Sequence, residues 1–252
     1  MKFSTLLIFL SLFCFSGFSQ INELDKNGEK HGKWTKNYPN STTPMYVGTF
    51  KHGKPIGTFT YYHPNNKVKA IIRHSENSSR SEAYMYHENK NLMAFGIYMN
   101  QKKDSVWTYY SPEGDLSYKE TYKNDVLNGK KVVYYIPEIR GQNTIQVMTE
   151  KNYENGILQG ATVEYFIDGT KKLEGQYKDG RFDGEVKRYH PNGNIESIQH
   201  YSNKVKHGWW ITYNESGKEL ARTYYRYGEV IEGEALKKLM AKYKEKGINP
   251  NK

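Results

Sequence analysis

Cysteine is nearly absent from this chain of 252 residues, and so are the short motifs that mark common catalytic sites. The single cysteine, Cys14, has no partner for an internal disulfide. The sequence contains no Gly-x-Ser-x-Gly elbow, no His-Glu-x-x-His motif, no phosphate-binding loop and no dinucleotide fingerprint. These absences favour a protein that is not an enzyme and that needs no cofactor.

Long apolar runs are also missing, except for one near the N-terminus from Leu6 to Phe15. This run follows a lysine and precedes small residues, which is the layout of a secretory signal peptide over residues 1–19, with cleavage after Ser19. A membrane anchor would need a longer run, and a lipoprotein signal would need a small residue where Phe13 precedes Cys14. We therefore expect an exported protein, whether periplasmic, at the cell surface or secreted, with no transmembrane segment after cleavage.

The chain does have a repeat with a period of about 24 residues. Successive copies begin at Asp25, Phe50, His74, Tyr98, Tyr122, Tyr153, Tyr177 and Tyr201, with a half copy at Tyr225. Twelve residues into the copies an aromatic recurs, at Tyr62, Tyr86, Tyr110, Tyr134, Tyr165, Tyr189 and Tyr213. Seven residues in, a turn glycine recurs at Gly32, Gly57, Gly129, Gly160, Gly184 and Gly208, with Ser81 and Ser105 in two copies; a second turn glycine follows, as at Gly193 and Gly217. A fixed period of this length predicts a repeat array.

Each copy has the pattern of a turn, a strand, a second turn and a second strand. The segment 184–189 is short and rich in residues that favour strands. The Pro-Asn-Gly that follows it suits a tight turn, and residues 194–201 are expected to form the second strand. The predicted fold is all-β, an elongated antiparallel β-meander of about eight hairpin copies over residues 20–231. An insertion near residues 136–148 explains the longer spacing between Tyr122 and Tyr153.

Large aromatics occupy a further fixed position, nine residues into the copy. Trp34, Phe59, Trp107 and Trp210 share it, and we expect them and the tyrosines twelve residues in to pack as structural ladders inside a thin array. The alternative is an exposed aromatic stripe that stacks on sugar rings or choline-like groups.

The repeat pattern stops before residues 232–252. Leu236, Leu239, Met240 and Tyr243 recur there at helical spacing and predict a short amphipathic helix. Its expected role is to cap the last hairpin and cover an open strand edge. A helix that lies on a membrane surface is the alternative.

The combination of Tyr-x-Asn/Asp-Gly, Gly-x-x-x-x-Tyr and x-Asn-Gly resembles the MORN repeat, in the bacterial variant found in proteins of the YwqK antitoxin family. The resemblance extends from Asp25 to Gly228 and is clearest between Tyr153 and Gly217. It implies a hairpin-repeat fold. For function it implies a scaffold, a membrane-associated module or an antitoxin-like partner.

The formal net charge of +10 and the 23 tyrosines indicate what such an array would present to a partner. Export makes nucleic acid an unlikely partner, and most lysines fit a solvated face. His63 and His87 fit polar turn residues better than metal ligands, because no carboxylate or third histidine stands at ligand spacing. We expect an exported, non-enzymatic binding or scaffolding protein that presents a basic, aromatic sheet surface to a protein partner or an envelope component. The alternatives are a toxin-neutralising protein and a module for anionic lipid or envelope glycan.

Overall fold

The computed structural model describes residues 21–137 and 145–251. The predicted signal peptide over residues 1–19, with Cys14, lies outside the described residues, and so does the middle of the expected insertion. Among the described residues no helix is long and apolar enough to cross a membrane.

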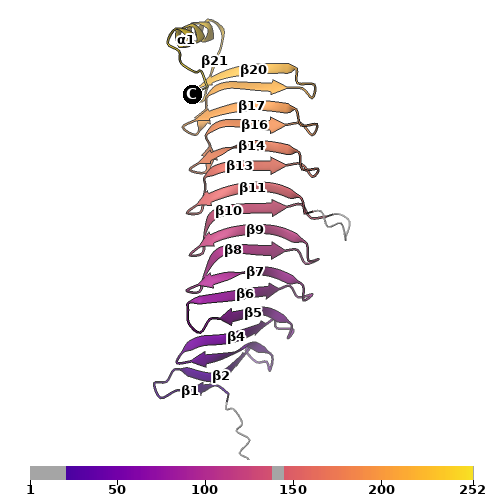
Figure 1. The fold of residues 1–252 in the computed structure, drawn as a ribbon, viewed down its shortest axis with the longest axis vertical. Coiled ribbons are helices and arrows are strands. Elements are labelled where there is room, and N and C mark those ends of the chain that lie inside the picture. The colour runs from indigo at the N-terminus through magenta and orange to yellow at the C-terminus, as the bar shows by residue number, and fades with distance from the viewer. Residues whose placement is uncertain (1–20, 138–144, 252) are drawn as a thin grey trace, which may run out of the picture.

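The described chain forms one open antiparallel sheet, and its strands lie across the long axis of the molecule in chain order (Figure 1). Successive long strands pair antiparallel, and the two-residue strands β12, β15 and β18 pair only with the strand before them, so the predicted meander of hairpin repeats is confirmed. The strands are β1 (Glu23–Leu24), β2 (Lys30–Asn37), β3 (Pro44–Lys51), β4 (Lys54–Tyr62), β5 (Val68–His74), β6 (Arg80–Tyr86), β7 (Leu92–Met99), β8 (Lys102–Tyr110), β9 (Leu116–Lys123), β10 (Val126–Tyr134), β11 (Val147–Glu154), β12 (Ile157–Leu158), β13 (Gly160–Tyr165), β14 (Lys171–Lys178), β15 (Arg181–Phe182), β16 (Gly184–Tyr189), β17 (Ile195–Ser202), β18 (Val205–Lys206), β19 (Gly208–Tyr213), β20 (Glu219–Arg226) and β21 (Glu229–Ile231). One short helix follows, α1 (Gly233–Glu245).

Two kinds of turn alternate along the two edges of the sheet. The turn that opens a copy has two residues with positive φ, as at Asn155 (50°) and Gly156 (83°), which is the primed turn that matches the twist of a hairpin. The other turn spans five residues. In the turn that begins at His190, the N–H of His190 donates to Asn194 O at 2.8 Å and the N–H of Gly193 donates to His190 O at 2.9 Å.

The glycine seven residues into each copy marks a break in strand register. All six glycines there have positive φ: Gly32 (72°), Gly57 (63°), Gly129 (122°), Gly160 (77°), Gly184 (80°) and Gly208 (70°). Ser105 takes the same left-handed conformation with φ of 58°, whereas Ser81 pairs regularly with His74. The fourth residue of the five-residue turns is also left-handed; it is a glycine at Gly193 (85°) and Gly217 (80°), and Asn66 (62°) or Lys90 (75°) in two other turns.

The sheet is a single layer, so its core is a narrow row rather than a volume between two layers (Figure 1). The position nine residues into the copy forms that row. Buried there are Phe59, Ala83, Trp107, Thr162 and Val186, each at most 2% exposed. The short helix matches the predicted C-terminal helix, and the residues after it return to the sheet, where the hydroxyl of Tyr224 donates to Pro250 O at 3.0 Å.

Candidate binding face

One face of the sheet collects most of the large aromatic side chains, because directly paired residues project to the same side. A continuous line of paired residues crosses it from β3 to β10: Tyr46, Tyr61, Ala70, Met85, Ala94, Tyr109, Tyr118 and Val133. The core row containing Phe59 and Trp107 lies on the same side, two residues along the strands. We call this side the aromatic face.

The largest core rings lie directly over glycines of the preceding strand. A Cβ on Gly48 would be 2.4 Å from the Phe59 ring, and a Cβ on Gly96 would be 2.1 Å from the Trp107 ring. Both distances are below any normal contact, so these two glycines leave the space that the rings occupy. In the C-terminal half the corresponding approach, from Gly175 to Val186, is 3.0 Å.

The three tryptophans nine residues into their copies donate their indole N–H groups to backbone oxygens. Trp107 Nε1 donates to Ile97 O at 3.0 Å, and Trp210 Nε1 donates to His200 O at 2.9 Å. Trp34 Nε1 lies within 3.1 Å of two such oxygens. These bonds fix the rings against the sheet, since a buried indole N–H needs an acceptor.

Each of these tryptophans also has a lysine four residues before it, with the ammonium group over the ring. The Nζ atom lies 4.7 Å from the ring centroid for Lys30 over Trp34, 4.7 Å for Lys103 over Trp107, and 4.4 Å for Lys206 over Trp210. Lys103 also donates to the hydroxyl of Tyr109 at 2.8 Å. Part of the positive charge therefore belongs to internal cation–π contacts and not to a free basic surface. The Lys-x-x-x-Trp spacing was the sequence signal for this arrangement.

The tyrosines twelve residues into the copies are half-buried and stand at the end of their strands. They are Tyr62, Tyr86, Tyr110, Tyr134, Tyr165, Tyr189 and Tyr213. The hydroxyl of Tyr189 donates to Glu174 Oε1 at 2.6 Å. Burial and this carboxylate raise the pKa of Tyr189 to about 12.

A ladder of hydrogen bonds links the five-residue turns of consecutive copies. His87 Nε2 donates to Tyr110 O at 3.1 Å, and His190 Nε2 donates to Tyr213 O at 3.0 Å. Asn192 Nδ2 likewise donates to Glu215 O at 2.9 Å. The turn histidines therefore bind the backbone of the next copy through one ring nitrogen.

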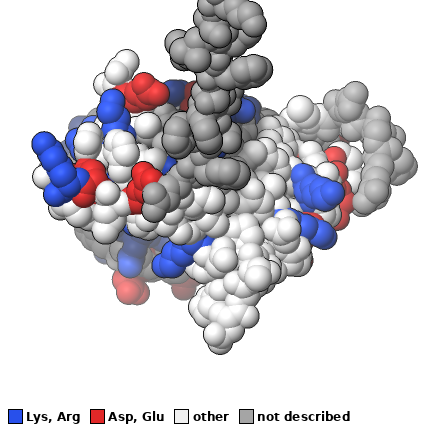
Figure 2. Space-filling model, turned by 90° about the horizontal axis from the view of Figure 1, so that it is seen from below, with Lys and Arg blue, Asp and Glu red and all other residues white. Residues whose placement is uncertain are grey.

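Charges of both signs are mixed over the surface. Figure 2, which views the array from its N-terminal end, shows basic and acidic side chains next to one another. Several face each other at contact distance, as in Lys131 with Glu120 (2.8 Å) and Lys187 with Glu185 (2.8 Å). The pairs leave no single-sign patch at those places.

The aromatic face has a groove in the N-terminal part of the array, with a volume of about 520 Å³. Five aromatic rings line it, Tyr46, Phe50, Phe59, Tyr61 and Tyr98, together with Gly53, Pro55, Ile72, His74, Ser81 and Gln101. Burial raises the pKa of Tyr61 and of Tyr98. Their hydroxyls therefore remain neutral, and the groove is an apolar surface with hydroxyl groups.

Three further side chains meet at the N-terminal end, where the sequence analysis expected no metal. Asp25, His31 and His52 each place one donor atom within 4.8 Å of the other two. The sequence interpretation considered only His63 and His87 as possible metal ligands. It did not consider this group, because Asp25 and His52 are 27 residues apart. No local spacing rule connects them.

Taken together, the single-layer sheet, the paired turns and the ring ladder define a β-hairpin repeat protein. Residues 55–77, 103–124 and 182–203 match the MORN repeat variant family, so the chain carries MORN repeat variants. Such repeats are generally binding or scaffolding modules and are typically non-catalytic.

Other comparisons add little to the family match. No curated protein matches the chain. Among solved structures, the chain is similar to TarM (14% identity, 52% of this chain and 20% of that one, TM-score 0.24) and to an S. aureus TarM mutant in complex with Fondaparinux, alpha-GlcNAc-glycerol and UDP (12%, 46% and 19%, 0.24). A GtfA/B complex bound to UDP and GlcNAc gives 12% identity, 68% and 27% coverage, and a TM-score of 0.18. The chain spans about a quarter or less of those lengths, and TM-scores this low carry no argument about function.

Proposed function

We propose that this chain is an exported, non-enzymatic binding or scaffolding protein that holds a protein partner on its aromatic face. The observation that carries the proposal is the groove bounded by Tyr46, Phe59, Tyr61 and Tyr98, on a sheet over which residues 21–137 and 145–251 form no second layer. Export rests on the signal peptide expected from the sequence.

The chemistry of the groove favours a protein over an anionic polymer or lipid. Aromatic side chains are enriched in the centres of protein interfaces, where they supply a large contact area at a low cost in side-chain entropy. The lysines beside the rings are already held in cation–π contacts, as Lys30 and Lys103 show. A toxin-neutralising role would be one form of protein binding.

The test is a pull-down with tagged residues 20–252 from envelope fractions of the native organism, at low and high salt. Tyr61→Ala removes a ring from the groove, and Tyr84→Ala removes a half-buried ring from the opposite face, where Tyr84 pairs with Ile71. We expect one protein to be retained at high salt by the wild type and by Tyr84→Ala, and to be lost with Tyr61→Ala.

Two outcomes would contradict this function. Equal retention by both variants would remove the groove from the binding site. Recovery of anionic lipid or polysaccharide that washes off with salt would point instead to binding by surface charge. Thermal melting of both variants checks that neither result comes from unfolding.

A further inference from the structure

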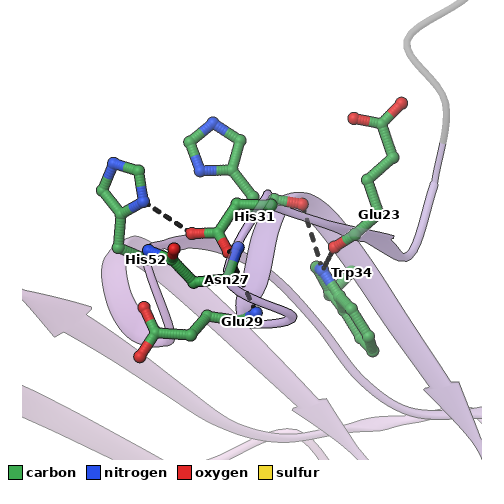
Figure 3. Close-up of polar contacts among 7 residues, drawn as sticks. Glu23, Asn27, Glu29, His31, Trp34 and His52 are labelled. Atoms are coloured by element: carbon green, nitrogen blue, oxygen red, sulfur yellow. Dashed lines mark hydrogen bonds and ion pairs between the residues drawn. The ribbon is translucent and has the colours of Figure 1, made fainter.

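Asp25, His31 and His52 come from three separate segments at the N-terminal end of the array (Figure 3). Asp25 begins the turn between β1 and β2, His31 lies in β2, and His52 lies in the two-residue turn between β3 and β4. The His31 and His52 rings are 5.1 Å apart between centroids and inclined by 47°. In Figure 3 both rings stand on the same side of the loop.

The carboxylate of Asp25 is fixed by its own turn. Its Oδ1 atom accepts the N–H groups of Asn27 (2.9 Å) and Glu29 (3.0 Å), while Oδ2 accepts from His52 Nδ1 at 2.7 Å. The side chain is only 8% exposed.

The two histidines are placed by backbone contacts and not by each other. The N–H of Gly53 donates to Lys30 O at 2.9 Å, which holds the His52 turn beside the start of β2. The Nδ1 atom of His31 is buried and has no hydrogen-bond partner in the described part of the chain. His74 and His207 also have such a ring nitrogen, but among the described residues only that of His31 lies in a group with a carboxylate and a second imidazole.

We propose that Asp25, His31 and His52 bind a zinc ion. This site is independent of the binding function proposed for the aromatic face. Three side-chain ligands leave one position of a tetrahedral ion for water or for a donor from a partner.

The donor set selects the class of metal. Two imidazoles with one carboxylate suit zinc, whereas calcium and magnesium prefer oxygen ligands alone. Donor atoms around tetrahedral zinc are roughly 3.3 Å apart, given bond lengths of about 2.0 Å. The present separations of up to 4.8 Å therefore require a shift of about 1 Å or more. His52 can supply it, because its side chain is 58% exposed in a turn.

The same positions in other copies show that the repeat does not need these side chains. Asparagine replaces His52 at Asn100, Asn124, Asn155 and Asn203, with φ between 50° and 53° against 47° for His52. Gln159 stands at the position of His31. At a different position of the repeat, Asn214 begins a five-residue turn and accepts from the N–H groups of Ser216 and Lys218, as Asp25 does from its own turn. Asparagine in place of His52 and glutamine in place of His31 are therefore compatible with the repeat fold.

These replacements define the experiment. The untagged full chain is titrated with ZnCl₂ against a chromophoric chelator, and Co²⁺ absorption in the visible region reports tetrahedral coordination. The variants are Asp25→Asn, His31→Gln and His52→Asn. We expect one zinc per chain, a rise of the melting temperature with zinc, and at least a tenfold loss of affinity in each variant.

His207→Gln is the matched control, since His207 occupies the same position in the last full copy and also has a buried Nδ1 without a partner, but faces Tyr227 at 5.7 Å. We expect it to bind zinc as the wild type does. Zinc binding that survives in His31→Gln and His52→Asn, or no binding by the wild type with melting curves unchanged, would overturn the site. Equal loss of affinity in His207→Gln would do the same.

Discussion

The two ends of the array are built from the same repeat but finish in different ways. At the C-terminal end the chain returns over the last hairpins: Tyr224 is 1% exposed, its hydroxyl reaches Pro250, and the N–H of Trp209 donates to Asn251 Oδ1 at 2.9 Å. At the N-terminal end, β1 pairs with β2 through two residues only. One end is closed by the chain itself, and the other ends in a small hairpin with a group of histidines and an aspartate.

This difference separates two solutions to the same problem. An exposed strand edge must be covered or interrupted, because its unpaired N–H and C=O groups can pair with other chains. The C-terminal segment is held on the last hairpin by the hydrogen bonds of Trp209 and Tyr224 to Asn251 and Pro250. The N-terminal end depends on the Asp25 turn and its neighbours, so we expect it to be the less stable end and the one that gains most from a bound ion.

The largest effect should come from opening the C-terminal end. Tyr224→Ala removes a fully buried ring that packs edge-on against Trp209 at 69°, with ring centroids 5.2 Å apart. We expect the free energy of unfolding to fall by about 3 kcal/mol, measured by urea denaturation. Tyr224→Phe loses only the bond to Pro250 and should cost about 1 kcal/mol. Similar values for the two variants would show that the ring contributes little to closure.

A smaller effect should distinguish the packing of the two halves. Gly48→Ala puts a Cβ 2.4 Å from the Phe59 ring, so the ring must move, and we expect a loss of about 2 kcal/mol. Gly175→Ala approaches a methyl group of Val186 at 3.0 Å, which a small shift relieves, and should change stability by less than about 1 kcal/mol. Both variants are compared by thermal and urea unfolding. The reverse order would contradict the close packing of ring on glycine.

The smallest effect should be a different response of the two halves to pH. Burial lowers the pKa of His74, so the folded state binds fewer protons at this ring than the unfolded state does. The free energy of unfolding is therefore unaffected above the unfolded-state pKa of about 6.5 and falls as the pH drops below it. The Lys171 and Lys187 ammonium groups lower the pKa of Glu174 and of Glu185 respectively, so their contribution is lost only when the pH falls below about 4.3.

Amide hydrogen exchange tests this contrast. Between pH 7.5 and pH 5.5, corrected for intrinsic rates, protection should fall in β5 and β6 more than in β14 to β17. His74→Gln should remove most of the difference. Equal loss of protection in both regions, or an unchanged difference in the variant, would show that another group controls the response.

The sequence was sufficient for the fold because the repeat is encoded locally. Glycines such as Gly184 and Gly193 have positive φ where the turn pattern predicted turns, and the spacing of Trp107 and Phe59 placed them in one row. Local patterns also predicted the short C-terminal helix, which the structure places at Gly233–Glu245.

Features that depend on contacts between copies could not be predicted from the sequence pattern. The fit of Trp107 over Gly96 depends on the register of two strands and the bulge between them. Asp25 and His52 meet only because the Gly53 N–H binds β2. Such contacts join residues of different strands, 11 positions apart for Gly96 and Trp107 and 27 for Asp25 and His52, and the repeat period alone does not say which side chains of adjacent copies converge.

The orientation of the strands across the long axis, seen in Figure 1, has a mechanical consequence. A force that pulls the two ends apart acts along the hydrogen bonds between strands, so it opens one strand pair at a time instead of shearing many together. Each copy of about 24 residues would release up to about 80 Å of chain. The array should therefore extend at low force in regular steps, because each strand pair opens separately from the next.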